Sequence, residues 1–487
     1  DINFIYLILI GQLMVFLGNV SVRIIRNWLI LHISNRVNIS MISDFFYKLL
    51  RLPILFFEKK NLGDILQRVY DHKRIQSFFN NTVTSSISLL NLIALSILII
   101  IYSTKIFLVF ILGNILYVIW IIIYLKKRRK IDFEMFEKNS TNYNCEVQLI
   151  QGVNDIKLNN SEKHKRWEWE SIQIELYKTK IRSLFINQLQ DEGSAIINEL
   201  KNIIIIFIAA IQVINDQISI GIMLAITQII GQLNLPIVQL VNTIRQIQDA
   251  NISLERLNDI HNQKSEDNKI ISNKNIPASI SKIKVQDLSF KYPIGNFELR
   301  NINFSILAGK SIAIVGESGS GKSTLLKLLL KFYKPDDGSI LLDNISLDDI
   351  STKEWREYIG VVMQDGFIFH DTIINNIIMA REFDEKRFIQ TLKIVNIYEF
   401  IKSTPDTYYS VLSGSNGISL SEGQKKRILL ARAIYKDPKF LFLDEATSGL
   451  DSNNEHAILN NLLKYLRGKT IVTIAHRLST FKLADRI

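Results

Sequence analysis

The chain has 487 residues, 47% of them hydrophobic, and a formal net charge of +11. Its length allows two or three domains. The positive charge does not indicate nucleic-acid binding, because much of the basic surplus lies beside long apolar runs, as in KKRRK at 126–130. That arrangement is typical of membrane proteins. The single cysteine, Cys145, excludes an intrachain disulfide, and we expect a lipid bilayer, not a nucleic acid, as a partner.

Five apolar runs are long enough to cross a bilayer as helices, which takes ~20 residues each. They are 2–22, 84–101, 106–125, 196–214 and 218–240. Short, nearly uncharged connections join the second run to the third and the fourth to the fifth, so each pair forms a hairpin. The long segments that precede the hairpins, 23–83 and 126–195, are rich in Lys and Arg. The positive-inside rule therefore places these segments in the cytoplasm and the hairpin tips outside.

The number of spans bears on where the chain begins. An odd number puts Asp1 outside and the C-terminal half in the cytoplasm, yet no signal peptide precedes the first apolar run. One earlier span would supply an insertion route, so we expect the first span of the membrane domain to be missing.

The cytoplasmic segments are expected to be helical, with breaks near 51–71 and 150–170. Short helices at these breaks would dock on a cytoplasmic domain; simple turns are the alternative. Polar residues within the spans are mostly uncharged, and they either line a wet cavity or form interhelical hydrogen bonds. These residues are Gln12, Asn91, Asn114, Gln212, Gln228, Gln232 and Asn234.

A glycine-rich loop follows the apolar strand SIAIV at 311–315 and precedes a leucine-rich helix. The loop matches G-x-x-x-x-G-K-[ST] in the strand–loop–helix context that this phosphate-binding motif requires. Backbone N–H groups of such a loop cradle phosphates, while Lys322 reaches the β- and γ-phosphates and the Ser323 hydroxyl coordinates Mg²⁺. We therefore expect ATP and Mg²⁺ as ligands, held by Gly316, Glu317, Ser318, Gly319, Ser320, Gly321, Lys322, Ser323 and Thr324.

Two carboxylates follow a second apolar run, in KFLFLDEATSGLD at 439–451. The run predicts a buried strand that ends at Asp444. Asp444 is expected to hold the Mg²⁺ shell, and Glu445 to act as the general base that positions water.

The order of these motifs resembles that of ATP-binding cassette (ABC) exporters, and the resemblance covers nearly the whole chain. It implies a multi-span α-helical membrane domain followed by an α/β P-loop nucleotide-binding domain. By this resemblance Tyr292 in FKYP stacks on adenine, and Gln364 in VVMQD senses Mg²⁺ and contacts the membrane domain. Asp451 in SGLD would be the D-loop residue, and His476 in TIAHRLST the catalytic switch histidine at the γ-phosphate.

The resemblance also organises the chain into domains. We expect a transmembrane domain at 1–260, a polar linker at 261–280 and the nucleotide-binding domain at 281–487. The family has six spans and a longer cassette, so both ends of the chain are expected to be incomplete. The breaks in the cytoplasmic segments would be coupling helices.

The stretch SLSEGQKKRILLARA, 419–433, resembles the family's signature motif. Ser421 is a predicted N-cap, and Gln424 completes a Ser-x-x-Gln capping box. Gly423 lies in the first turn, where glycine is unfavourable; in the family it lets the helix approach the γ-phosphate of ATP on the opposite subunit. Glu422 stands where the family usually has glycine. Because the helix dipole favours an acid there, we expect it to be tolerated and both ATP sites to hydrolyse.

One membrane domain with one cassette makes a half transporter, so the resemblance implies a homodimer. ATP would close the cassettes and turn the membrane domain outward, and hydrolysis would reset it. The chain is thus expected to be an ATP hydrolase of the bacterial inner membrane, multi-pass, with its nucleotide-binding domain in the cytoplasm. Accessory proteins of the envelope are further candidate partners.

The cargo is suggested by the stretch at 52–79, which resembles bacterial exporters that carry an upstream papain-like peptidase. Those exporters cleave double-glycine leaders, so a bacteriocin-type peptide is the expected substrate. A multidrug or lipid exporter of the same fold is the alternative. An ATP-binding module without transport is disfavoured by the five spans, and a hydrolysis-dead channel by the presence of Glu445 and His476.

Overall fold

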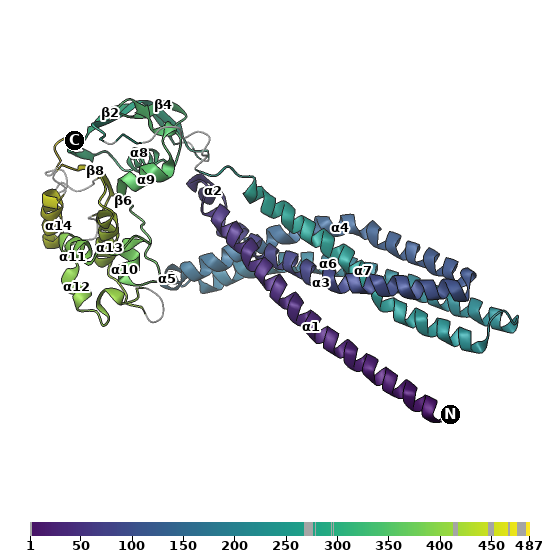
Figure 1. The fold of residues 1–487 in the computed structure, drawn as a ribbon. Helices are drawn as coiled ribbons and strands as arrows, with labels where there is room; N and C mark the ends of the chain where they lie inside the picture. Colours follow the sequence, from purple (N-terminus) through teal and green to yellow (C-terminus); the bar gives the residue numbers. More distant parts are fainter. Residues whose placement is uncertain are drawn as a thin grey trace. The chain divides into compact units, whose positions relative to one another are not determined.

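The computed structural model describes residues 2–266, 276–277, 279–293, 295, 297–412, 417–446, 452–465, 468–474 and 484–487. The chain divides into two compact units (Figure 1). The first contains residues 1–52 and 56–264, and the second contains residues 53–55 and 265–487.

Long helices dominate the N-terminal half of the chain, coloured purple to teal in Figure 1. They are α1 (Ile2–Leu49), α2 (Ile54–Lys59), α3 (Leu62–Tyr102), α4 (Thr104–Gln151), α5 (Val153–Leu158), α6 (Glu162–Ile214) and α7 (Ile220–His261). Within the described residues, α1, α3, α4, α6 and α7 are each long and apolar enough to cross a membrane. These five helices coincide with the five apolar runs of the sequence.

The membrane-length helices are longer than the bilayer requires. The 41 residues of α3 correspond to about 60 Å at 1.5 Å per residue, twice the ~30 Å of a hydrocarbon core. The helices therefore extend beyond the membrane, as the basic segments predicted. The short helices α2 and α5 lie in the two segments where breaks were expected.

Polar residues of the spans join neighbouring helices. The Gln212 amide donates to the Ser103 hydroxyl at 3.1 Å, which links α6 to the connection between α3 and α4. The Asn198 amide donates to the Asn234 side chain at 3.1 Å, between α6 and α7. The sequence left two roles open for these polar residues, a wet cavity or interhelical hydrogen bonds. For Gln212 and Asn234 the structure supports interhelical hydrogen bonds.

A charged residue in the fourth span was missed by the sequence reasoning. Lys201 is 3% exposed, and its amine donates to the side-chain oxygens of Asn114 at 3.1 Å and Asn198 at 2.7 Å. Gly113 leaves room for it, because a Cβ at that position would lie 2.5 Å from Lys201 Cγ. The signal was the sequence ELK at 199–201, which lies inside the apolar run 196–214.

The second unit combines two sheets with short helices. The strands are β1 (Lys282–Lys291), β2 (Glu298–Leu307), β3 (Ser311–Ile314), β4 (Asp337–Leu342), β5 (Ile345–Ser346), β6 (Ile359–Val362), β7 (Phe440–Asp444) and β8 (Thr470–Ile474). The α-helices are α8 (Lys322–Leu329), α9 (Thr352–Tyr358), α10 (Ile373–Ile378), α11 (Glu385–Ile394), α12 (Tyr398–Lys402), α13 (Glu422–Tyr435) and α14 (Ser452–Tyr465). Two 3-10 turns, Leu347–Asp349 and Thr407–Tyr409, complete the described elements.

The two sheets differ in direction. One is antiparallel with strand order β2-β1-β4-β5, and the other is parallel with order β3-β8-β7-β6. Strand β7 is buried along its whole length, as the apolar run FLFL predicted for a strand in a parallel sheet. Trp355 of α9 is fully buried and donates its indole N–H to the Leu329 carbonyl at 2.8 Å, which holds α9 against α8.

Candidate nucleotide-binding site

The parallel sheet brings two predicted motifs to one edge. Strand β3 ends at Ile314, directly before the glycine-rich loop, and β7 ends at Asp444. Both strands run parallel to β8, which lies between them. Their carboxyl ends therefore meet at the same edge, where open α/β sheets bind ligands.

A cavity of about 320 Å³ lies at this edge. It gathers most of the residues predicted for ATP binding, from three parts of the second unit. Its lining consists of Tyr292, Phe297, Ser318, Gly319, Gly321, Lys322, Ser323, Thr324, Gln364 and Glu445. The general base predicted from the sequence thus shares one cavity with the phosphate-binding loop.

The loop has the backbone of a phosphate cradle. Gly319 and Gly321 have φ angles of +81° and +95°, which glycine adopts readily. Lys322 is 8% exposed, and its amine donates to the carbonyl oxygens of Gly316 at 2.9 Å and Glu317 at 2.7 Å. The loop thereby holds the ammonium group beside the N-terminus of α8, where anions bind favourably.

Aromatic side chains form the other end of the cavity. Tyr292 lies with its ring centroid 6.2 Å from that of Phe297, and its hydroxyl is 3.1 Å from the Thr324 hydroxyl. Phe297 was not predicted as a site residue. It lies in the connection between β1 and β2, and an aromatic residue in a connection carries no sequence signal that separates a ligand contact from a packing contact.

The residues predicted to hold Mg²⁺ supply oxygen atoms from a hydroxyl, an amide and a carboxylate, and oxygen ligands suit this ion. Ser323 and Gln364 line the cavity, and the backbone carbonyl of Gln364 accepts a hydrogen bond from the Lys426 amine at 2.6 Å. Asp444 is 3% exposed at the end of β7. Glu445 has a φ of +50°, an uncommon backbone conformation that is often found at functional sites.

The signature residues lie elsewhere in the unit. Ser421 caps α13: its hydroxyl accepts from the Gln424 N–H at 3.2 Å, and the Gln424 side chain accepts from the Ser421 N–H at 2.8 Å. The predicted capping box is therefore confirmed. Glu422 and Gly423 follow in the first turn, and the four residues are not part of the lining of the cavity.

Two predicted site residues, Asp451 and His476, lie outside the residues that the structure describes. Among those it does describe, no group of three or more His, Cys, Asp or Glu side chains could hold a metal ion. A site with one or two carboxylates agrees with Mg²⁺, which is usually bound together with substrate phosphates.

A phosphate-binding loop at the edge of a parallel sheet, together with five membrane-length helices among the residues that the structure describes, defines a nucleotide-binding membrane protein. Comparison with known families agrees with this class. Residues 1–237 match the family model of the ABC transporter transmembrane region, and residues 299–448 match that of the ABC transporter.

Individual relatives show the same combination. The alpha-hemolysin translocation ATP-binding protein HlyB of Escherichia coli O157:H7 is 33% identical over 487 residues, 99% of this chain and 68% of the relative. The leukotoxin translocation ATP-binding protein LktB of Mannheimia glucosida is 33% identical over 468 residues, 95% of this chain and 65% of the relative. The chain thus spans about two thirds of the length of the curated relatives it matches.

A solved structure has the same fold. It is that of a bacterial Atm1-family ABC exporter with ATP bound, which superimposes with a TM-score of 0.85 at 24% identity, over 93% of this chain and 80% of the other. The chain belongs to the ABC transporter family. It is a multi-span membrane protein of the exporter type, a half transporter that joins one membrane domain to one ATPase domain.

Proposed function

We propose that the chain is one half of a homodimeric exporter that hydrolyses ATP to move a polypeptide across the bacterial inner membrane. The observation that carries this proposal is the cavity that joins Tyr292, the phosphate-binding loop, Gln364 and Glu445. Its aromatic end suits a base and its glycine-rich end suits phosphates, so the two ends match the two ends of a nucleotide.

The polar residues predicted from the sequence each have a role in this proposal. Lys322 binds the β- and γ-phosphates, and Ser323, Gln364 and Asp444 hold Mg²⁺, which neutralises charge on the phosphate oxygens. Glu445 accepts the proton of the attacking water and positions it. His476 is proposed to contact the γ-phosphate.

A second copy completes the site. The cavity lining comes from one face of the cassette, whereas Ser421 and Glu422 are exposed at the N-terminus of α13. A helix N-terminus binds anions, and in a twofold dimer the same surfaces of both copies meet. We therefore assign Ser421, Glu422, Gly423 and Gln424 to the ATP of the partner subunit, with Asp451 between the two sites.

Polypeptide cargo is the choice favoured by the relatives, whose names refer to translocation of alpha-hemolysin and of leukotoxin. Both are named for the export of a toxin, which extends the expected cargo from a bacteriocin-type peptide to longer polypeptides. Accessory proteins of the envelope would carry the cargo onward. A multidrug or lipid exporter is the competing proposal.

The experiment uses the full chain reconstituted in lipid vesicles. Wild-type protein should release phosphate from ATP in the presence of Mg²⁺, and Glu445→Gln should retain ATP while losing at least about 10²-fold in rate, the scale of general-base catalysis. Glu354→Gln, at an exposed glutamate of α9 that has no role in the proposed site, is the matched control, and it should hydrolyse normally. Full turnover by Glu445→Gln would reject Glu445 as the base. Stimulation by an unfolded polypeptide, and not by apolar drugs, would support the cargo proposal.

A further inference from the structure

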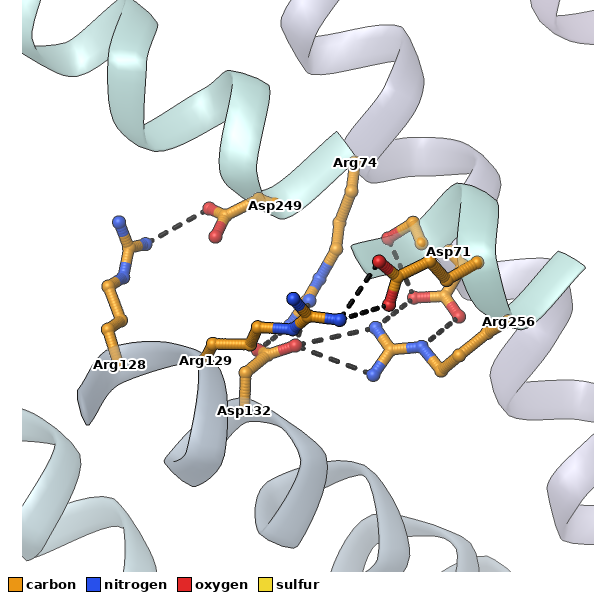
Figure 2. A network of polar contacts seen from close by, with 9 residues as sticks. Asp71, Arg74, Arg128, Arg129, Asp132, Asp249 and Arg256 are labelled. Atoms are coloured by element: carbon orange, nitrogen blue, oxygen red, sulfur yellow. Dashed lines mark hydrogen bonds and ion pairs between the residues drawn. The ribbon is translucent and has the colours of Figure 1, made fainter. Parts of the chain in front are cut away.

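The first unit contains a network of charges, with a buried centre and partly exposed edges, that the nucleotide site does not explain (Figure 2). It joins three helices, α3, α4 and α7. The helices of this unit pack mainly as two pairs, α3 with α7 and α4 with α6, whereas α4 touches α7 much less. The network lies at this sparse junction between α4 and α7.

The centre of the network is Arg256 of α7. Its guanidinium donates twice to Asp71 of α3, both at 2.9 Å, and the Ser253 hydroxyl adds a third bond to Asp71 at 3.1 Å. Arg256 and Asp71 are 5% and 1% exposed. A buried, bidentate pair of this kind is short and geometrically specific, so α3 and α7 are held firmly together.

Asp132 of α4 is shared between two arginines. It accepts two bonds from Arg74 of α3, both at 2.8 Å, but its contacts with Arg256 are longer, at 3.4 and 3.5 Å. The Arg256 guanidinium also lies over the Phe136 ring of α4, 4.5 Å from its centroid. The link between α4 and α7 is therefore the weakest edge of the triangle of helices.

Two further pairs connect α4 to α7. Arg128 and Asp249 are in contact at 3.0 Å and are partly buried, whereas Arg129 and Glu255 are each half exposed. An exposed pair contributes little, so Arg129 and Glu255 provide an internal control for the buried part of the network.

Stability alone does not account for this arrangement. The side chains that pair across the three helices are three arginines and three aspartates, of which Arg256 and Asp71 are buried and the others partly exposed: Arg74, Arg128, Arg256, Asp71, Asp132 and Asp249. Apolar side chains of similar volume are often as stabilising as buried ion pairs, and the best-attested use of such pairs is to fix register or to switch. The contrast between short and long contacts favours a switch.

We propose that this network is a latch that holds α4 against α7, while Arg74 and Asp132 keep α4 attached to α3. In its closed state Asp132 contacts both Arg74 and Arg256; in its open state α4, together with α6, moves away from α7, and Asp132 keeps only Arg74. Asp71 stays bound to Arg256 in both states, whereas the partly exposed Arg128 and Asp249 separate in the open state and become hydrated. On the basis of the proposed function, ATP drives the exchange between these states during the transport cycle.

Crosslinking tests the latch without ATP. In the full chain with Cys145→Ser, thiols are introduced at Leu125 and Gln248, where the Gln248 side chain contacts the Leu125 carbonyl at 2.6 Å across α4 and α7. A second pair, at Ser85 and Thr243, reports on α3 and α7, where the two hydroxyls lie 2.5 Å apart. A short, reducible bifunctional reagent joins each pair.

The variant that opens the latch is Asp132→Asn, and its matched control is Glu255→Gln. Asp132→Asn should lower the crosslinking rate between α4 and α7 by about threefold or more, which is the scale of coupling between contacting residues. The crosslinking rate between α3 and α7 should stay unchanged. Glu255→Gln should change neither rate. The proposal would be overturned if Asp132→Asn changed the crosslinking rates of both thiol pairs equally, or changed neither rate. If Asp132→Asn does not fold, Arg74→Met with Asp132→Leu removes the same link without an unpaired charge.

ATP hydrolysis provides the second measurement. The crosslink between α4 and α7 should stop hydrolysis until it is reduced, whereas that between α3 and α7 should not. Normal hydrolysis by the α4–α7 crosslinked protein would reject the latch and leave the proposed function intact. Absence of hydrolysis in the wild type would instead reject the proposed function, and the crosslinking rates would still decide on the latch.

Discussion

The hydroxyl of Tyr292 lies 3.1 Å from the hydroxyl of Thr324, in the first turn of α8. Tyr292 follows β1, whereas Thr324 follows the phosphate-binding loop, so this contact links the aromatic end of the cavity to its phosphate end. Edge contacts with Phe290 and Tyr333, at centroid distances of 5.1 and 5.4 Å, hold the Tyr292 ring in place. The ring is therefore oriented by the protein alone, which lowers the cost of ordering it when a base binds.

Two substitutions of Tyr292 should distinguish stacking of its ring on the adenine base from the hydrogen bond that its hydroxyl makes with Thr324. We expect Tyr292→Ala to weaken ATP binding roughly tenfold or more, since base–aromatic stacking is worth ~1–3 kcal/mol. Tyr292→Phe keeps the ring and loses one hydrogen bond, worth ~1 kcal/mol, so its effect should be smaller. Titration of the full chain with a fluorescent ATP analogue measures both. If the two variants lose the same affinity, stacking is not the source of binding.

Phe297 is expected to contribute to the base end of the same cavity. Phe297→Ala should weaken ATP binding, whereas Phe297→Leu should retain part of the apolar contact. Inorganic tripolyphosphate, which has no base, is the control ligand, and its competition with the fluorescent analogue should be unchanged in both variants. A parallel loss for tripolyphosphate would mean that Phe297 supports the loop and not the base.

Gly321 and Gly319 form a matched pair for the phosphate-binding loop. Both have positive φ, but a Cβ on Gly321 would clash with Leu299 Cδ2 and lie 2.8 Å from Phe297 Cζ, whereas a Cβ on Gly319 has no neighbour within 4 Å. Gly319→Ala should therefore cost only the backbone strain, ~1 kcal/mol, and Gly321→Ala more. Thermal unfolding of the full chain, followed at the transition of the second unit, compares the two. Equal losses would show that the packing of Leu299 and Phe297 against Gly321 does not constrain the loop.

The parts of the site that were predictable are those encoded by neighbouring residues. The loop from Gly316 to Ser323 has its strand before it and its helix after it, and Ser421 has its capping partner Gln424 only three residues away. Phe297 could not be assigned because its role depends on the fold of β1 and β2 around it. Composition and spacing specify such local features, whereas cavities depend on distant packing.

The charge network shows the same limit in the membrane unit. Arg256 and Asp71 are 185 residues apart in the chain, and Arg128 and Asp249 are 121 apart. Asp71 and Arg128 lie in the basic segments, and Asp249 and Arg256 follow the last apolar run. From composition alone, the positive-inside rule assigns all four to the cytoplasmic side without showing which are buried. Only the packing of α3, α4 and α7 shows which arginines are buried and paired.

A polar cluster in the second unit should make stability depend on pH. The Asp437 carboxylate accepts hydrogen bonds from the Lys469 amine and, at 3.1 Å, from the Tyr465 hydroxyl. Burial acts to raise the pKa of Asp437, but the hydrogen bond and charge of Lys469 outweigh it and hold the pKa below its usual value. Burial, reinforced by the Asp437 charge, raises the pKa of Tyr465 to about 12.

The two shifts act at opposite ends of the pH range. The lowered pKa of Asp437 stabilises the fold above its usual value of 3.8, and this contribution is lost as the pH falls through the folded-state pKa. For Tyr465 the unfolded chain releases its proton near pH 10 while the folded chain keeps it until about 12, so stability falls between these values. Tyr465→Phe should reduce the loss between pH 10 and 12, and Asp437→Asn should reduce the acid dependence, in thermal unfolding of the full chain. An unchanged alkaline slope in Tyr465→Phe would assign that loss to other groups.

Ser421 has two roles in the proposed dimer, and two substitutions distinguish them. As an N-cap it accepts the Gln424 N–H; as a signature residue it would donate to the γ-phosphate of the partner's ATP. Ser421→Ala removes both and should cost ~1 kcal/mol of stability. Ser421→Asp keeps the cap, because aspartate is as good an N-cap as serine, but it places a negative charge where the phosphate would bind.

We therefore expect Ser421→Asp to unfold at the wild-type temperature and to lose ATP hydrolysis, whereas Ser421→Ala should lose both stability and rate. Mixing Ser421→Asp with Glu445→Gln chains adds a test of the dimer. In a mixed dimer, each ATP site combines Glu445 of one chain with Ser421 of the other, so one site carries both defects and the other carries neither. If one intact site can act alone, hydrolysis should return to part of the wild-type rate. A variant Ser421→Asp that hydrolyses ATP normally would contradict the assignment of α13 to the partner's nucleotide, because the added carboxylate would then be far from any phosphate.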